Sequence, residues 1–486
     1  MKKRIPGLAA LIVLAVILFV SAGGQDTRSG TAATGGQVTK PREIFAVADT
    51  GFGDDSQVER IAQYFTEKTG IRLRVLKPPH NEYATKLNLQ LFSGDVPDIM
   101  EVGSNDYLSY VSQDALFPMR DLIFSYRPFQ QVDSSFFEAL AVRGEIYGIQ
   151  KEIGNGSVTY LRKDWLDKLG LQVPKTYNEF INVLRAFTNN DPDGNGRKDT
   201  VGYISASISN GYTQDFFQGA YMGFRKNAQG RWVDGMGEEV MYQALERMAA
   251  AYREGLIEPD IFTLSTADAR TKFYSGGAGA FSYWAGAWAG TIDIELKRNN
   301  PNASVVAMPP VGNYKFFNRL APIIALTVHG NAKNPRGVFE YMIKYMFDLG
   351  EGQTWATHGV EGFTYKFEGG NMVPLPSPQT PDVVPSQPGG GWLNSALRFT
   401  PFNDPFKVRA DAAYTQQLFL DNSFTEQLVP PVTSFVRNEP DLRLLRAETI
   451  AKAMRGPQSV REVHDEYKTK ARTYGVDETL RELNNY

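Results

Sequence analysis

The 486-residue chain contains no cysteine and only four histidines, and these shortages exclude several kinds of chemistry. Without cysteine there is no disulfide, no thiolate metal site, no cysteine nucleophile and no lipidated N-terminal cysteine. The histidines lie far apart and show no metal-ligand spacing. Gly-x-Ser-x-Gly, His-Glu-x-x-His and P-loop motifs are also absent. Paired carboxylates for glycoside hydrolysis have no fixed spacing and stay open, but no motif favours an enzyme.

An excess of charge of one sign is also missing. The chain has 51 lysines and arginines against 54 aspartates and glutamates, a formal net charge of −3. This balance gives no electrostatic case for nucleic acid or an anionic membrane as the main partner.

The N-terminus has the order of a bacterial export signal. Lys2, Lys3 and Arg4 precede an apolar run over residues 8–20, and small residues follow it. The run is shorter than the about 20 apolar residues that a transmembrane helix needs, although an uncleaved anchor stays an alternative. We predict a signal peptide over 1–22, a flexible Gly/Ser/Thr-rich linker over 23–40, and export to the periplasm or cell surface.

Strands and helices alternate at the beginning of the folded part. Short β-prone runs at 43–48, 71–76 and 97–102 are separated by amphipathic helical patterns at 55–69 and 83–92. This order predicts a βαβ unit and a parallel sheet. Ligands bind beyond the carboxyl ends of strands in such sheets, so the loops after Ala48 and Val102 are candidate edges of a site.

A loop with calcium-binding spacing follows in the middle of the chain. Side-chain oxygens stand at loop positions 1, 3, 5 and 9, which are Asp191, Asp193, Asn195 and Asp199. Position 6 is Gly196, and the backbone carbonyl of Arg197 would serve position 7. Position 12 is Gly202 and not the usual acid. We therefore expect a structural Ca²⁺ site with a Kd of about 10⁻⁴–10⁻³ M. A plain turn that holds no metal is the alternative.

Aromatic side chains gather where a predicted strand ends. Tyr283, Trp284 and Trp288 stand beside glycine and alanine, and Trp392 follows three glycines. Aromatic rings can stack on the apolar faces of sugars, and clefts combine such walls with a few polar groups. The alternative is that these rings serve the hydrophobic core.

Five segments occur in the order typical of one protein family. They read LFSGDVPDIMEV from Leu91, LRKDWLDKLGLQVPKTYNEF from Leu161, NNDPDGNGRKDTVGY from Asn189, FYSGGAGAFSYWAGAWAGTID from Phe273 and HGVEGFTYKF from His358. The chain resembles the family 1 extracellular solute-binding proteins of ABC importers, especially the oligosaccharide-binding lipoprotein subgroup, and is similar to maltose-binding proteins. The similarity extends from about residue 43 to 486.

The resemblance implies an α/β, two-lobed periplasmic-binding-protein fold of type II-like architecture. Each lobe would hold a mostly parallel sheet with helices, and the ligand cleft would lie between the lobes. We expect an N-terminal lobe from 41–155 plus about 318–370, and a C-terminal lobe from 156–317 plus about 371–486. Closure of the two lobes about a hinge would then trap the ligand.

The resemblance also implies which residues contact the ligand. Trp288 corresponds to a sugar-stacking tryptophan of the family, Asn105 to a polar contact, and Tyr212 and Phe217 to a ligand-facing aromatic stretch. Asp49 and Trp392 are further candidates.

The expected function is capture of a carbohydrate oligomer for the permease subunits of an ABC importer, by a monomer that is not an enzyme and binds no nucleic acid. Gly23 or Gly24 replaces the subgroup's lipidated cysteine, so the means of retention at the membrane stays open. The alternatives are an exported calcium-dependent polysaccharide-degrading enzyme, and a sensor or adhesion protein without a transport role.

Overall fold

The computed structural model describes residues 38–49, 53–152, 154, 156–206, 214–382, 384–385, 388–389, 406–425 and 427–486. The predicted signal peptide and most of the predicted linker lie outside these residues. The chain from Thr39 to Tyr486 forms one compact unit. Within the described residues, every helix is too short or too polar to cross a membrane.

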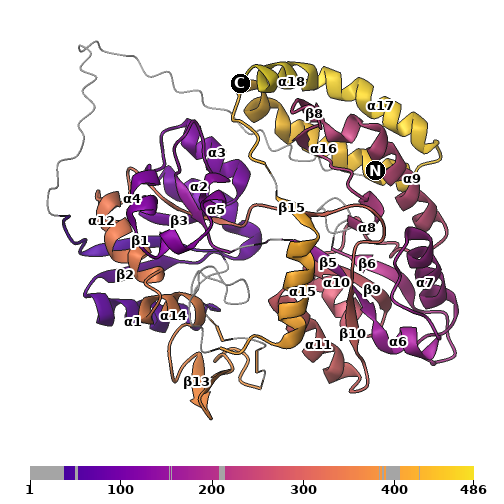
Figure 1. Ribbon diagram of the computed structural model, residues 1–486, viewed down its shortest axis with the longest axis horizontal. Helices are drawn as coiled ribbons and strands as arrows, with labels where there is room; N and C mark the ends of the chain where they lie inside the picture. The colour runs from indigo at the N-terminus through magenta and orange to yellow at the C-terminus, as the bar shows by residue number, and fades with distance from the viewer. Residues whose placement is uncertain are drawn as a thin grey trace, which may run out of the picture. The chain divides into compact units, whose positions relative to one another are not determined.

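The first sheet has the order β2-β1-β3-β12-β4 (Figure 1). Its strands are β1 (Glu43–Val47), β2 (Arg72–Leu76), β3 (Ile99–Val102), β4 (Gly148–Gln150) and β12 (Ile323–Leu326). β1 runs parallel to β2 and β3, which confirms the predicted βαβ unit. β12 runs antiparallel to both β3 and β4.

Short helices surround this sheet. They are α1 (Val58–Thr69), η1 (His80–Glu82), α2 (Tyr83–Leu91), α3 (Ser104–Ser112), α4 (Arg120–Ser125), η2 (Phe129–Gln131), α5 (Ser134–Glu138), α12 (Pro335–Val338), η5 (Phe339–Ile343), α13 (Lys344–Met346) and α14 (Glu351–His358). α1 ends as the sequence predicts, because Gly70 adopts a left-handed conformation with φ +67° and caps the helix. Together, sheet and helices enclose a hydrophobic core drawn from residues 44–149 and 320–360.

The second sheet has the order β10-β5-β9-β6. Its strands are β5 (Ser157–Arg162), β6 (Val201–Ser205), β9 (Ala278–Trp284) and β10 (Val305–Met308). Only β6 and β9 pair in parallel, whereas β5 is antiparallel to both of its neighbours. Both sheets are mixed, but all strands of each sheet except one run in the same direction, which confirms the expectation of mostly parallel sheets. In each one the chain arrives from the other sheet and inserts a reversed strand, β12 in the first and β5 in the second.

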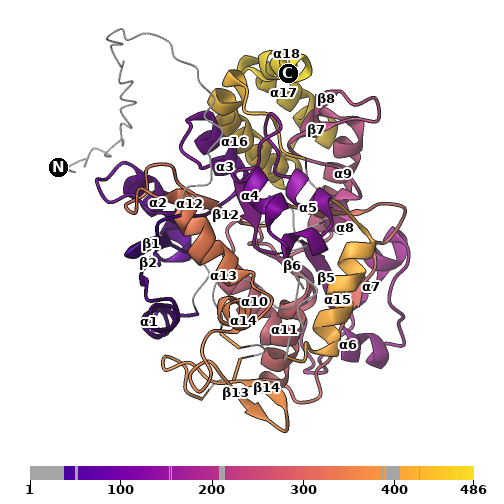
Figure 2. The ribbon, with the colours of Figure 1, turned by 60° about the vertical axis from the view of Figure 1, so that its left-hand side comes forward.

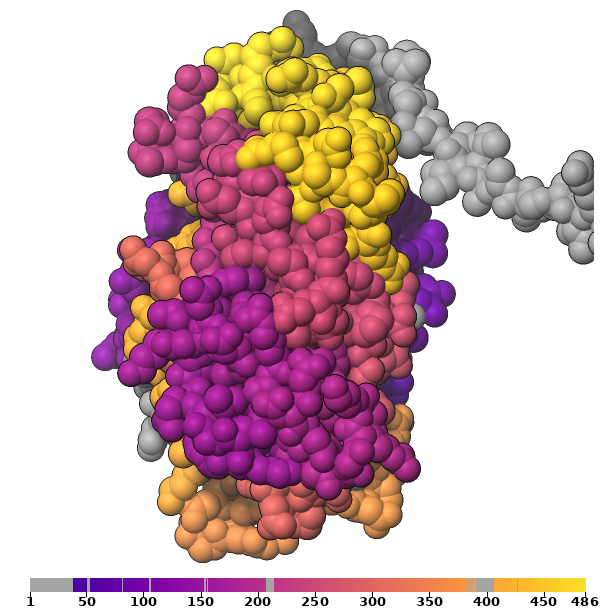
Figure 3. Space-filling view, turned by 90° about the vertical axis from the view of Figure 1, so that its right-hand side faces the viewer, coloured from indigo at the N-terminus to yellow at the C-terminus, as the bar shows by residue number. Residues whose placement is uncertain are grey.

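Helices and two small strands cover the second sheet and extend it. They are α6 (Lys163–Lys168), α7 (Tyr177–Asn189), α8 (Gln214–Phe217), β7 (Phe224–Lys226), β8 (Trp232–Asp234), η4 (Gly235–Gly237), α9 (Glu239–Arg253), α10 (Thr266–Tyr274), α11 (Ala287–Asn299), α15 (Ala410–Asp421), α16 (Thr433–Arg455), α17 (Val460–Thr473) and α18 (Val476–Asn485). α7, α10 and α17 begin with capping boxes. α16 packs against α9, α17 and α18, and Figure 3 shows these yellow C-terminal helices lying over the 220–260 segment.

The segment that runs from the second sheet back to the first carries β11 (Phe316–Asn318), which pairs with β15 (Ser423–Thr425) between α15 and α16. These two strands, called the crossing strands below, form a two-stranded parallel ladder in which Phe317 lies opposite Phe424. A separate hairpin of β13 (Tyr365–Glu368) and β14 (Asn371–Pro374) projects below α14 (Figure 2).

Trp355 on α14 anchors the first core and allows a test of it. The side chain is 1 % exposed, its ring contacts those of Phe65 and Tyr345, and its Nε1 donates to the carbonyl oxygen of Ile61 at 3.0 Å. Trp355→Ala should lower the free energy of unfolding by about 3–5 kcal/mol, since it leaves a large cavity. Urea unfolding measures this loss.

The control is Leu89→Ala on α2, whose side chain is 63 % exposed. Its loss should stay within about 0.5 kcal/mol. Similar small losses for both variants would mean that Trp355 is not an anchor of this core.

Candidate functional site

A pocket of about 410 Å³ lies beside the crossing strands β11 and β15. Its walls come from α8 and the turn after it, from the segment around β11, from β15 and from α16. The lining residues are Gln214, Phe217, Gly219, Ala220, Tyr221, Met222, Gly223, Tyr314, Lys315, Phe317, Arg319, Phe424, Glu439, Arg443, Arg446 and Ala447. Segments that are far apart in the sequence thus meet at the place where the chain passes between the two sheets.

One wall of this pocket is aromatic. The ring of Phe317 lies 4.6 Å from that of Tyr221 and 5.5 Å from that of Phe424, between centroids. The parallel ladder sets the second contact, because it holds Phe317 and Phe424 at the same register. Phe424 remains 43 % exposed, so this wall offers an apolar face to a ligand.

A buried hydrogen-bond network lies behind the pocket. The carboxylate of Asp215 on α8 accepts hydrogen bonds from the hydroxyls of Thr159 and Tyr314, the latter at 2.5 Å. Thr159 continues the network to Ser282, which accepts from the hydroxyl of Tyr203 at 2.8 Å. Burial raises the pKa of Asp215 to about 6, although both hydroxyls favour the carboxylate.

Charged side chains also gather where the strands of the first sheet end. Lys151, after β4, donates from Nζ to Glu101 on β3 at 2.8 Å, and both are buried. Burial alone would lower the pKa of Lys151, but attraction to Glu101, Glu152 and Asp49 raises it. Asp49, after β1, contacts Nδ1 of His80 at 2.8 Å, and this hydrogen bond raises the pKa of His80. The predicted site residue Asp49 therefore lies in a charged cluster at the carboxyl ends of the strands.

The aromatic residues predicted from the sequence occupy two positions. Phe217 lines the pocket but is otherwise buried. Trp284, at the end of β9, is half-buried and packs against the guanidinium of Arg319, which lies 5.6 Å from its ring. Trp284 does not itself line the pocket but contacts Arg319, which does.

Trp288 and Tyr283 come together elsewhere, with ring centroids 4.9 Å apart. Trp288, on α11, is half-buried, and the guanidinium of Arg270 lies 5.1 Å from its ring. Tyr283 is only 2 % exposed, and its hydroxyl accepts a hydrogen bond from Arg270 at 2.7 Å. In this arrangement Tyr283 and Arg270 support Trp288 from below.

The remaining predicted positions are less fully described. Asn105 is the second residue of α3, after β3, but its side chain is not among those described. Tyr212 and Trp392 lie outside the described residues. Sequence reasoning missed Tyr221, Phe317, Phe424 and the cations of the pocket, because only the folded chain brings them together.

The predicted calcium loop folds around its first aspartate. The carboxylate of Asp191 accepts hydrogen bonds from the backbone N–H groups of Gly194, Asn195 and Gly196, each at 3.0 Å. The two glycines adopt left-handed conformations with φ +77°, as the sharp turn requires. The amide of Asn195 donates to Asp193 at 2.8 Å and to Asp199 at 3.1 Å.

The donor set of this loop fits a calcium ion in part. Burial and the neighbouring carboxylates raise the pKa of Asp193, and a cation would relieve that crowding. A flip of the Asn195 amide would present its oxygen beside the two carboxylates. Position 12 differs from a complete site, because a Cβ at Gly202 would lie 2.6 Å from the backbone oxygen of Leu184 on α7. As the loop stands, no three acidic or histidine side chains of the described residues are arranged to hold a metal ion.

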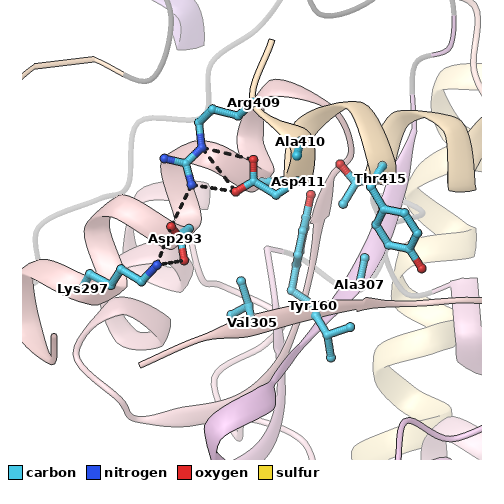
Figure 4. A pocket seen from close by; sticks show the side chains of 12 residues that line it. Tyr160, Asp293, Lys297, Val305, Ala307, Arg409, Ala410, Asp411 and Thr415 are labelled. Carbon is cyan, nitrogen blue, oxygen red and sulfur yellow. Dashed lines mark hydrogen bonds and ion pairs between the residues drawn. The ribbon is translucent and has the colours of Figure 1, made fainter. Parts of the chain in front are cut away.

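A second cavity, of about 480 Å³, lies between α11, β10 and α15 (Figure 4). Its charged groups are paired with one another: Arg409 binds Asp411 and Asp293 at 2.8 Å each, and Asp293 also binds Lys297 at 2.8 Å. None of the residues predicted to contact a ligand lines this cavity. We therefore take the pocket beside the crossing strands as the candidate ligand site.

Comparison with known proteins agrees with this geometry. The family model of the bacterial extracellular solute-binding proteins matches residues 50–348, more than half of the chain. The chain belongs to this family. This match confirms the resemblance to the extracellular solute-binding proteins that the sequence motifs indicate.

Two curated proteins and two solved structures illustrate the similarity. Lipoprotein LipO of Bacillus subtilis is 29 % identical over 43 % of this chain and 44 % of its own length. The fructooligosaccharide ABC transporter substrate-binding protein FusA of Streptococcus pneumoniae is 32 % identical over 33 % of each chain. The chain therefore spans less than half the length of the curated relatives it matches.

The solved structures cover nearly the whole chain. The alginate-binding protein AlgQ2, solved without calcium ion, has a TM-score of 0.67 at 21 % identity and covers 92 % of this chain and 98 % of its own. An EF-hand mutant of FusA in complex with fructo-nystose has a TM-score of 0.64 at 18 % identity, covering 91 % and 98 %. The fold is thus the two-lobed α/β fold of this family.

The buried network predicts a pH dependence of stability. Because folding raises the pKa of Asp215 from an ordinary value of about 4 to about 6, the folded state binds the extra proton in this range. The contribution of Asp215 to stability is therefore largest below pH about 4, falls by about 3 kcal/mol as the pH rises to 6, and is constant above.

Asp215→Asn should remove this dependence of the free energy of unfolding on pH. Chemical unfolding at pH values from about 4 to 7.5 measures it. The matched control is Asp382→Asn, at an exposed position, which should keep the wild-type profile. If Asp215→Asn keeps the pH dependence of the wild type, another titratable group causes that dependence.

Proposed function

We propose that this protein is the extracytoplasmic substrate-binding component of an ABC importer, and that it captures an oligosaccharide. The observation that carries the proposal is the aromatic wall of Tyr221, Phe317 and Phe424, which stands among hydrogen-bonding and charged groups at the crossing strands. Flat apolar rings with polar neighbours suit sugars, whose rings have apolar faces and hydroxyl edges.

Closure of two lobes gives this site a mechanism. The lobes would be 41–155 plus about 318–370, and 156–317 plus about 371–486. A ligand that contacts both lobes stabilises the closed state by its additional contacts there, so binding shifts the population toward that state. The permease subunits would then recognise the closed form.

The names of the relatives support a carbohydrate ligand. FusA is named for fructooligosaccharides and AlgQ2 for alginate. We infer capture rather than cleavage. Trp284, Trp288, Asp49, Asn105, Tyr212 and Trp392 are proposed ligand contacts, and Tyr283 and Phe217 are proposed supports behind them.

The cellular location follows from the same assignment. Members of an extracellular solute-binding family act outside the cytoplasm. We infer export by the N-terminal segment and action in the periplasm or at the cell surface, as a monomer beside the permease.

The test of function is a thermal-shift and calorimetric screen of the purified protein against neutral and acidic oligosaccharides. A rise of several degrees with one chemical class is expected, because a ligand that binds only the native state stabilises it. Long incubation should release no new reducing ends. Cleavage of a polysaccharide would instead support the degrading enzyme, and no response to any saccharide would contradict the proposal.

The tryptophans allow a sharper test. Trp284→Ala and Trp288→Ala should each weaken saccharide binding by about 1–3 kcal/mol, by analogy with the loss of one stacking ring under a base. Calorimetric titration measures the change in Kd. Phe367→Ala on β13, an exposed ring of the remote hairpin, is the control and should bind as the wild type does. An unchanged Kd would remove that tryptophan from the site.

We also propose that the loop 191–199 binds Ca²⁺ as a structural ion. Asp191, Asp193, Asn195 and Asp199 would supply side-chain oxygens and Arg197 its carbonyl. The structure of AlgQ2 without calcium ion and the EF-hand mutant of FusA support a calcium site in the family. The ion would tie the end of α7 to the beginning of β6.

With a Kd of about 10⁻⁴–10⁻³ M, addition of about 10 mM Ca²⁺ should stabilise the folded state by about 1–3 kcal/mol. Thermal melting with Ca²⁺ and with chelator measures this difference. Asp193→Asn and Asp199→Asn should abolish it, while Asp382→Asn should retain it. Identical melts of the wild type in both conditions would exclude the ion.

A further inference from the structure

We propose that the pocket beside the crossing strands selects an anionic oligosaccharide, one whose sugar rings carry carboxylate or sulfate groups. This inference rests on the proposed function and names the substrate class of the same site.

The side chains that line the pocket carry an excess of positive charge. Four cations, Lys315, Arg319, Arg443 and Arg446, face a single acid, Glu439. The whole chain has the opposite balance, with a net charge of −3. Positive charge is thus concentrated at this pocket against the average of the protein.

Two of these cations have no counter-ion among the residues that the structure describes. Lys315 and Arg443 are exposed, and neither makes a hydrogen bond or an ion pair with a described residue. Asp106 on α3 and Glu439 lie within electrostatic range of Arg443, without an ion pair to it. An anionic ligand would supply the missing partners for both cations.

Arg446, in the interior of α16, differs from these two cations because ion pairs hold it in place. Its guanidinium is buried and pairs with Glu439 at 2.7 Å and with Asp234 at 3.4 Å. Its Nε is buried without a partner. These two carboxylates are thereby engaged within the protein, which leaves Lys315 and Arg443 to attract a ligand.

The crossing strand arranges its cations around an aromatic ring. Lys315, Phe317 and Arg319 alternate along the extended segment, and all three line the pocket, while Phe316 and Asn318 between them are buried. Alternate residues of a strand lie on one face, at about 3.3 Å per residue. In an extended segment the Cα atoms of Lys315 and Arg319 are thus about 13 Å apart, with Phe317 midway.

This spacing suits a chain of charged sugars. One ring would stack on Phe317 and its neighbours Tyr221 and Phe424, and anionic groups on the flanking rings would reach the two cations. The acids at the strand ends of the first sheet do not oppose this arrangement, since Asp49 is bound to His80 and Glu101 to Lys151. A neutral sugar would stack equally well but would leave Lys315 and Arg443 unpaired.

The experiment compares three trisaccharides by calorimetry with the purified protein. The probes are trigalacturonate, its carboxyl-reduced neutral counterpart and a sulfated trisaccharide. The better anionic probe should bind at least about 10-fold more tightly than the neutral one, and the preferred anion identifies the group as carboxylate or sulfate. Its affinity should fall steeply with added salt, which screens exposed charges, while that of the neutral probe stays constant.

Matched variants assign the effect to residues. Lys315→Gln and Arg443→Gln should each weaken binding of the anionic probe about 5–10-fold and leave binding of the neutral probe unchanged, because both side chains are exposed and make no hydrogen bond or ion pair with a described residue. Arg472→Gln on α17, an exposed cation away from the pocket, is the control and should alter neither.

Equal affinity for neutral and anionic probes, or equal losses for both probes in the two variants, would overturn the inference while oligosaccharide capture stands. Failure of all saccharides, including the wider panel, would overturn both.

Discussion

The chain passes repeatedly between two sheets, each of which has its own hydrophobic core, and this passage constrains the architecture. Backbone that leaves a sheet loses its hydrogen-bonding partners, and unpaired N–H and C=O groups are costly to bury. Part of the solution is the ladder of β11 and β15, in which the segment that runs from the second sheet back to the first pairs with the strand between α15 and α16. The same passage explains why both sheets are mixed: β5 and β12 arrive from the opposite sheet and insert in the reverse direction.

The crossing ladder also creates the candidate site. The ladder holds Phe317 against Phe424, and the two rings form an apolar wall outside both hydrophobic cores. Because side chains alternate along a strand, Lys315 and Arg319 lie on the same face as Phe317. Polar groups around this wall are held from behind. Gln214, next to Asp215, accepts a hydrogen bond from the backbone N–H of Phe317, so α8 supports both the strand and the buried network. Structural and binding roles thus meet in one short segment.

The sequence predicts those features that depend on local pattern. The βαβ unit follows from periodicity, and α1 ends at Gly70, directly after the predicted helical pattern over 55–69. The calcium loop is recognised because all its oxygens lie within nine residues. The cationic pocket could not be found in this way, since Lys315 and Arg443 approach each other only through the folded chain. Trp284 could be named as a candidate, but its contact with Arg319 could not.

The balance of charge around the pocket depends on which groups are accessible. Asp215 and Asp234 are acids close to the site, but Asp215 is buried and Asp234 largely so, and hydroxyls or Arg446 occupy their oxygens. Lys315 and Arg443 lie at the surface with no such partners among the described residues. A ligand therefore contacts the exposed cations directly, and only solvent screening weakens their attraction. The acids do not contact the ligand, because other side chains of the protein already pair with them. Tyr314 lies between the pocket and the buried acid. Its ring lines the pocket, and its hydroxyl donates a hydrogen bond to Asp215. Asp215 thus holds part of the pocket wall in place without contacting the ligand.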